Sequence, residues 1–238
     1  MKDSSADSPP MLYARFAGAL YLAIIVFGVA SEIFIRAKLV VHGDAAATAD
    51  NILSFSTLFR AGFVADVLML FCDVALAVLL YRLLKPVSPT LSLMAAAFRL
   101  VQAAIIGFGL LNYYAPLLLL GKGYAPAFDA GQLQVLAAFF LDLHGHGYDL
   151  GLLFFGVSNL ILGYLLIRSD YFPSLFGYAL QAGAAVYLMG SFTRFLSPES
   201  LPFVQPAYAI PLLAELAFCL WLLVRGVKPA REARRLVG

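Results

Sequence analysis

The 238-residue chain has few of the residues that carry common enzyme chemistry, with three histidines, two cysteines and one tryptophan. It contains no G-x-x-x-x-G-K-[ST] phosphate loop, no G-x-S-x-G elbow, no H-E-x-x-H helix and no Cys-x-x-Cys pair. These absences argue against a phosphate-loop nucleotidase, a serine hydrolase, a zinc protease and a dithiol redox protein. No pair of histidines lies at mid-span to hold a haem, so we expect no cofactor.

Charge is also scarce, because only 13% of the residues are charged against roughly 25% in an ordinary soluble domain. Hydrophobic residues make up 62% of the chain, and the mean hydropathy is +0.88. The formal net charge of +2 is too small to indicate a nucleic-acid partner. The composition predicts a polytopic membrane protein whose main partner is the lipid bilayer.

Six apolar runs are long enough to cross the roughly 30 Å hydrocarbon core of a bilayer as helices. They are residues 12–35, 61–83, 90–120, 150–167, 173–195 and 207–224. We therefore expect an all-α bundle of six transmembrane helices with short loops over residues 11–226. Residues 1–10 are expected to be a disordered start, and 227–238 a basic tail.

Several short sequence patterns predict local structure or processing outside or within these runs. Asp44, followed by alanines and then spaced apolar residues, predicts a short interfacial helix in the first outer loop. Residues 132–143 predict a short helix leading into span four. Three prolines in 197–206 argue against regular structure there. Gly28-Val29-Ala30 also resembles a signal-peptide cleavage site, so cleavage of the first span stays an alternative.

Basic residues set the expected orientation, because Lys and Arg accumulate in cytoplasmic loops. Ten of the sixteen fall on the side of the termini: Lys2, Arg15, Arg82, Lys85, Arg168, Arg225, Lys228, Arg231, Arg234 and Arg235. Five fall on the other side, and Arg99 lies within a span. Both termini are therefore expected to be cytoplasmic.

Eight tyrosines lie near predicted span ends, where amphipathic rings settle at headgroup level. They are Tyr13, Tyr113, Tyr114, Tyr124, Tyr148, Tyr171, Tyr178 and Tyr208. We expect most of them to be interface anchors. Cys72 and Cys219 fall inside spans two and six, where free buried thiols are expected.

Ionisable groups within spans are costly and are therefore candidates for function. At about 1.5 Å per residue, Asp73 and Glu215 lie about 18 and 12 Å in from the outer face, and Arg99 lies about 15 Å in from the inner face, so all three are close to the midplane. Arg99 stays charged, so it needs a carboxylate or a water-filled cavity. An ion pair could simply fix the packing of spans two, three and six, or it could line a polar pathway. The remaining members of this midplane polar network are Gln102, Asn159 and Gln181.

A second set of polar residues is predicted at the outer face: Glu32, Arg36, Arg60, Asp66, Asp142, His144, His146, Asp149 and Arg194. On a continuous helix Asp142, His146 and Asp149 share one face, and His144 points elsewhere. Histidine and carboxylate side chains suit a divalent first-row metal. The alternatives are a proton-titrating or substrate-contacting cluster, or a solvated cap of the bundle. We predict no metal site, with His144, His146, Asp142 and Asp149 as weak candidates for one.

Several glycine-rich motifs resemble those of one family. They are Gly151-Leu-Leu-Phe-Phe-Gly156, Gly163-Tyr164-Leu165-Leu166, Arg168-Ser169, Pro173, Gly177, Asp44, Asn51, Phe59-Arg60 and Phe98-Arg99. On these residues the chain resembles the bacterial multi-pass proteins catalogued as domain of unknown function 4386, over most of Tyr13 to Leu223. The resemblance implies an integral protein of the bacterial inner membrane. It implies no activity and no catalytic residues.

The preferred functional hypothesis is transport or binding of a small molecule or ion through the midplane network, without a covalent reaction. One alternative is an intramembrane metal-dependent enzyme that uses Glu32 and the His/Asp residues of the outer face. The other is a structural or sensory subunit, whose partner is another membrane protein or a second copy of the chain.

Overall fold

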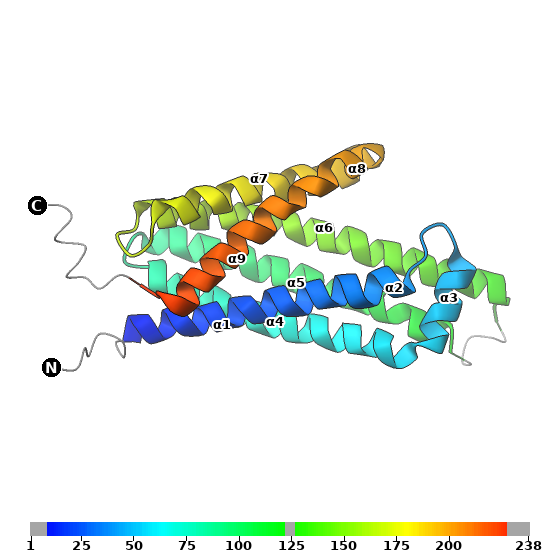
Figure 1. The fold of residues 1–238 in the computed structure, drawn as a ribbon. Coiled ribbons are helices and arrows are strands. Elements are labelled where there is room, and N and C mark those ends of the chain that lie inside the picture. The colour runs from blue at the N-terminus through cyan, green and yellow to red at the C-terminus, as the bar shows by residue number, and fades with distance from the viewer. Residues whose placement is uncertain (1–8, 122–126, 228–238) are drawn as a thin grey trace, which may run out of the picture. The chain divides into compact units, whose positions relative to one another are not determined.

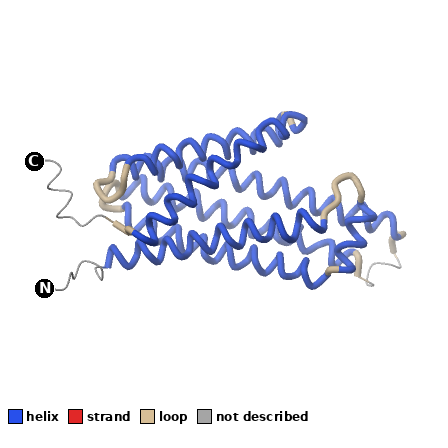
Figure 2. The backbone as a smooth tube through the Cα atoms, in the orientation of Figure 1, coloured by secondary structure: helices blue, strands red, loops and turns tan. Residues whose placement is uncertain are grey.

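A computed structural model of the chain describes residues 9–121 and 127–227, and all regular structure in this part is helical (Figure 2). The principal helices are α1 (Pro9–Ala30), α3 (Ala45–Ser54), α4 (Ser56–Leu84), α5 (Pro89–Leu119), α6 (Ala130–Arg168), α7 (Ser174–Leu196) and α9 (Ala209–Val224) (Figure 1). Short elements are the π-helix η1 (Ser31–Arg36), α2 (Ala37–Leu39), α8 (Leu201–Val204), and the 3-10 turns η2 (Pro198–Ser200) and η3 (Gln205–Tyr208).

Six helical segments within the described residues are long and apolar enough to cross a membrane. Four of them are α4, α5, α6 and α7. The first is the run Pro10–Leu39, and the last is Pro198–Val224. The all-α, six-span architecture predicted from the sequence is confirmed, and the chain is a multi-pass membrane protein.

Helix boundaries differ most from the predicted ones at two places. Residues 132–143 are not a separate helix, because α6 continues through Gly145 and Gly147, whose cost of about 1 kcal/mol each is small beside a 39-residue helix. The prediction that 197–206 lacks regular structure was wrong. Its prolines occupy the first or second positions of short helical turns, where a missing N–H breaks no intrahelical bond.

The predicted cap at Asp44 is confirmed, since its side chain accepts a 2.8 Å hydrogen bond from the backbone N–H of Ala47 at the start of α3. Upstream, α1 passes directly into η1. A π-helix bonds each N–H to the carbonyl five residues earlier and is frequent at functional sites. Helix α9 ends at Val224, and Gly226 follows two residues later with a φ of +63°, which suits a residue without a Cβ.

The chain divides into two compact units. Unit 1 comprises the described residues within Met1–Ala23, Cys72–Ala103 and Leu150–Gly238, and unit 2 those within Ile24–Phe71 and Ala104–Asp149. Helices α1, α4, α5 and α6 therefore each contribute residues to both units.

Unit 1 is held together by close helix contacts at glycines. Helices α7 and α9 lie side by side (Figure 1), and a Cβ on Gly183 of α7 would come within 2.9 Å of the Pro211 Cα in α9. A Cβ on Gly163 of α6 would lie 2.6 Å from the carbonyl oxygen of Gly177 in α7. Small residues allow such approach where lipid offers no hydrophobic driving force between helices.

Both described ends of the chain lie at one end of unit 1. Gly226, after α9, lies against the side chain of Met11 in the first turn of α1. The Arg82 guanidinium near the end of α4 lies 5.0 Å from the centre of the Tyr13 ring. The end of α4 therefore shares this end of unit 1 with the start of α1.

Unit 2 has its own apolar core, formed by Ile35, Leu39, Ile52, Phe59 and Tyr113. Tyr113 is 0% exposed, stacks on Phe59 at 4.3 Å and donates a 3.0 Å hydrogen bond to the Phe59 carbonyl. The expectation that Tyr113 is an interface anchor was wrong. Position near a span end does not reveal whether a ring faces lipid or the inside of the bundle.

Candidate functional site

The most buried charges of unit 1 form one ion pair. Arg99 projects from the middle of α5 and Asp73 from the middle of α4, and they are 2% and 3% exposed. Arg99 Nε donates a 2.7 Å hydrogen bond to Asp73 Oδ1, and Nη2 lies 2.5 Å from the same oxygen. A guanidinium and a carboxylate this far from solvent require each other, because either one alone would leave an uncompensated buried charge.

Neighbouring side chains complete the surroundings of this pair. With its amide nitrogen facing acceptors, Gln102 donates to Asp73 Oδ2 at 2.9 Å and to the Arg99 carbonyl at 3.2 Å. The guanidinium carbon lies 4.8 Å from the centre of the Phe155 ring and 5.5 Å from that of Tyr21, within range for cation–π attraction. Arg99 is thus enclosed by one carboxylate and two ring faces.

Glu215 of α9 is the centre of a second buried group in unit 1. Its carboxylate accepts a 2.9 Å hydrogen bond from the Tyr187 hydroxyl and a 3.4 Å one from the Asn159 amide. The hydroxyl of Tyr21, whose ring lies under Arg99, faces the same carboxylate. Gln181 instead donates to the Leu160 backbone carbonyl at 3.3 Å. The structure therefore brings five of the six predicted network residues into two adjoining groups, and Asp73 is the carboxylate that pairs with Arg99.

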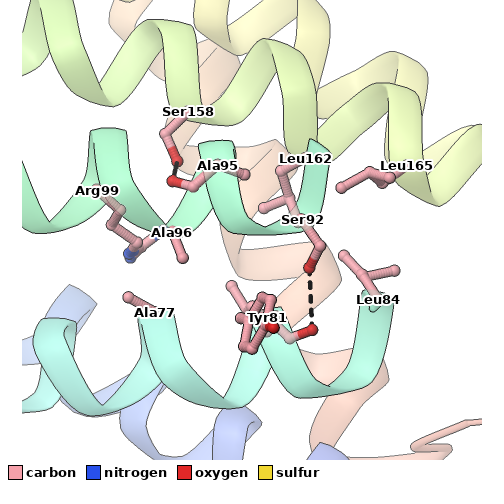
Figure 3. Close-up of a pocket in the computed structure, with 11 residues that line it drawn as sticks. Ala77, Tyr81, Leu84, Ser92, Ala95, Ala96, Arg99, Ser158, Leu162 and Leu165 are labelled. Carbon is pink, nitrogen blue, oxygen red and sulfur yellow. Dashed lines mark hydrogen bonds between the residues drawn. The ribbon is translucent and has the colours of Figure 1, made fainter. Parts of the chain in front are cut away.

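A cleft between α4, α5 and α6 leads to Arg99 (Figure 3). Its empty volume is about 270 Å³, part of it open to the outside. The lining residues come mostly from apolar positions: Ala77, Leu80, Tyr81, Leu84, Ser92, Ala95, Ala96, Arg99, Ser158, Leu162 and Leu165. Figure 3 shows the polar end of Arg99 directed between Ala96 and Ala77. Its Nη1 has no hydrogen-bond partner among the described residues.

The ionic cluster of unit 2 is built around Arg36, the last residue of η1. Arg36 Nε donates to Glu32 at 2.7 Å, and Nη1 donates to Asp66 at 2.7 Å and to Ser31 at 2.9 Å. The Asp66 side chain on α4 is 3% exposed, whereas that of Glu32 is 65% exposed. One turn of π-helix therefore supplies three of the four members of this cluster.

The two α6 histidines point to different surroundings, as expected for a continuous helix. His144 is buried; its Nδ1 donates to the Gly109 carbonyl at 3.1 Å, and its ring meets that of Tyr113 edge to face. The partly exposed His146 donates to the Asp142 carbonyl at 2.9 Å on its own helix. Within residues 9–121 and 127–227, no three His, Cys, Asp or Glu side chains are grouped to hold a metal ion.

Two further members of the predicted outer-face set lie on other elements, and a third has a tyrosine as its partner. Arg60 donates to the Tyr114 hydroxyl at 2.7 Å. Asp149 is a half-buried residue of α6, and Arg194 is on α7 in unit 1. The structure brings together Glu32, Arg36 and Asp66 from this set.

Sequence reasoning missed the tyrosines that serve the charges. Tyr21 and Tyr187 lie in the middle of α1 and α7, and Tyr21 is completely buried. A tyrosine at mid-span is itself a signal, since a buried hydroxyl needs a polar partner. Ser31 was missed because its role depends on the wider turn of η1, which no sequence pattern predicted.

Comparison with known proteins identifies relatives but no activity. A model of the family described as "Domain of unknown function (DUF4386)" matches residues 16–226. An uncharacterised protein of the archaeon Archaeoglobus fulgidus is 29% identical over 166 residues, which cover 68% of this chain and 81% of that protein. No solved structure matches the chain. The family resemblance found from the motifs is confirmed, and the origin in a bacterial membrane stays a prediction.

Proposed function

This chain belongs to the DUF4386 family of membrane proteins, and we propose that it handles a small molecule or an ion through the polar network of unit 1, without covalent chemistry. The observation that carries the proposal is a fully charged side chain with spare hydrogen-bond donors facing a cleft. Arg99 is 2% exposed, and its Nη1 is unpartnered among the described residues. An intramembrane ionisable group is a functional candidate by default, and this one has somewhere for a ligand to bind.

Both carboxylates of the network already have partners, which favours transport or binding of a small molecule or ion over catalysis. Asp73 already pairs with Arg99, and Glu215 is held by hydroxyl and amide donors. The metal-dependent alternative at the outer face has less support, because its histidines diverge along α6.

The test is flux across proteoliposomes that contain the purified protein. An internal pH dye and indicators for common inorganic ions and small neutral solutes would be compared with protein-free vesicles. We expect at least one flux that is absent without protein and that Gln102→Leu reduces, because this change removes a donor from Asp73 while keeping the ion pair. Arg60→Gln, which removes a guanidinium outside the network, is the matched control. Absence of any protein-dependent flux, or a flux that Gln102→Leu leaves unchanged, would contradict the proposal and favour a purely structural ion pair.

The proposal also includes the orientation of the protein in the membrane. We infer that both termini face the cytoplasm, because the start of α1 and the end of α9 meet where Arg82 also lies, and basic residues favour the cytoplasmic side. We expect a protease to cleave a C-terminal tag in inverted membrane vesicles but not in spheroplasts. The reverse pattern would contradict it.

A further inference from the structure

We propose that the cleft beside Arg99 is a one-sided water pathway, which opens at Tyr81 and leads to the Asp73–Arg99 pair from the end of unit 1 where α1 begins and α9 ends. The inference rests on the proposed function, and it narrows the species handled there to water or a proton carried by water.

Size is the first argument for water. Although the whole cleft has an empty volume of about 270 Å³, the enclosed part has room for about one water molecule. An organic solute does not fit beside Arg99 without moving the Ala77 and Ala96 walls. A lone water needs two to four polar partners, and the lining offers Arg99, Ser92 and Ser158.

Hydrogen-bond direction is the second argument. Ser92 Oγ donates to the Tyr81 carbonyl at 2.9 Å, and Ser158 Oγ donates to the Ala95 carbonyl at 2.8 Å (Figure 3). The hydroxyl protons are therefore used, whereas Arg99 Nη1 still has protons to give. The occupant must accept from Arg99, and water can do so while also donating to a serine oxygen.

Charge balance is the third argument, because it distinguishes water from a small anion of the same size. Asp73 Oδ1 lies 2.5 Å from Arg99 Nη2, so the guanidinium is already neutralised within unit 1. An added anion would leave a net negative charge among apolar residues, which is costly. A neutral acceptor avoids that cost.

The position of Tyr81 indicates at which end of unit 1 the cleft opens to water. Tyr81 is the only lining residue that is not buried. Lys85 Nζ lies 5.9 Å from the centre of the Tyr81 ring, and the neighbouring Arg82 lies over Tyr13. Basic side chains keep their charged ends in water, so a mouth beside two of them opens to water and not to hydrocarbon.

Silver ion tests the pathway, since it is close to water in size and binds thiolates. Single cysteines would be placed in the Cys72→Ala, Cys219→Ala protein at two matched pairs of positions. Ala96→Cys and Ala77→Cys face the cleft, whereas the adjacent exposed positions give the controls Ala97→Cys and Val78→Cys. After exposure to silver, protection from alkylation in the denatured protein is measured by mass spectrometry, in vesicles where the reagent reaches the C-terminal end and in vesicles of opposite orientation.

We expect protection of both cleft cysteines to be faster than that of both controls by more than about tenfold, because silver enters hydrocarbon only at high cost. The difference should appear only with reagent on the C-terminal side. Equal rates within each pair, or protection from the opposite side alone, would overturn the pathway. Flux plays no part in this measurement, so a protein with normal flux but an inaccessible cleft refutes the pathway and leaves the proposed function standing. A cleft that silver reaches in a protein with no flux would support the pathway and contradict the proposed function.

Discussion

Arg99 in unit 1 and Arg36 in unit 2 each donate a 2.7 Å hydrogen bond to an almost completely buried aspartate, but their other nitrogens have different surroundings. Arg36 also binds Ser31 and the exposed Glu32, so one side of its cluster reaches the surface. Arg99 instead has aromatic faces and a narrow cleft around it. The first arrangement satisfies a cation with several protein groups, whereas the second leaves donors available for a small occupant.

The largest predicted effect is the loss of stability when the charge of Arg99 is removed. Arg99→Leu leaves Asp73 buried without a counterion, and we expect unfolding in detergent micelles to become easier by about 3–5 kcal/mol. Asp73→Leu combined with Arg99→Leu should recover most of that loss, because no charge then remains unpaired. Circular dichroism during thermal or denaturant unfolding would measure both. A single variant as stable as the parent protein would show that the pair does not maintain the fold.

A smaller effect compares helix contacts in the two units. Gly163→Ala in unit 1 places a methyl group 2.6 Å from the Gly177 carbonyl oxygen and should cost about 1–3 kcal/mol through overpacking. Gly147→Ala in unit 2 meets nothing nearer than the Gly109 Cα at 3.9 Å. Its stability should be unchanged or higher by up to about 1 kcal/mol, since alanine favours helix. Equal losses in the same unfolding assay would contradict this distinction.

The smallest predicted effect concerns the exposed side of the Arg36 cluster. Glu32→Gln removes a charge whose side chain is 65% exposed, so we expect a loss of stability below about 1 kcal/mol. That loss should disappear as salt is raised, because screening acts on exposed pairs. The loss in Arg99→Leu should not change with salt. A salt-insensitive effect of Glu32→Gln would mean that this carboxylate is more enclosed than its exposure indicates.

The fold could be predicted because hydrocarbon imposes simple requirements on sequence. A run of about twenty apolar residues is sufficient to identify a span, and the six spans follow from that rule alone. The depth estimates also placed Arg99 level with two carboxylates. They left the choice between Asp73 and Glu215 open, because depth fixes position along a helix but not rotation about its axis.

The remaining details of the site depend on such rotations and on irregular backbone. Tyr21 faces Arg99 and Glu215 because of how α1 is turned in unit 1. Tyr113 has the sequence position of an interface anchor but lies at 0% exposure in the core of unit 2. The cleft follows from alanines at 77, 95 and 96 that face one another from two helices, and neither sequence segment alone indicates a cleft.

The π-helix η1 determines how Arg36 is rotated about the helix axis relative to Ser31 and Glu32. Each wider turn accommodates about one additional residue, which on a regular helix corresponds to a rotation of about 100°. Ser31, Glu32 and Arg36 all lie within this element, and Arg36 donates to Ser31, to Glu32 and to Asp66 of α4. Removing one residue between Glu32 and Arg36 would therefore rotate the guanidinium away from Ser31 and Glu32, and the Asp66 carboxylate would lose a cation that other groups of unit 2 hold in place.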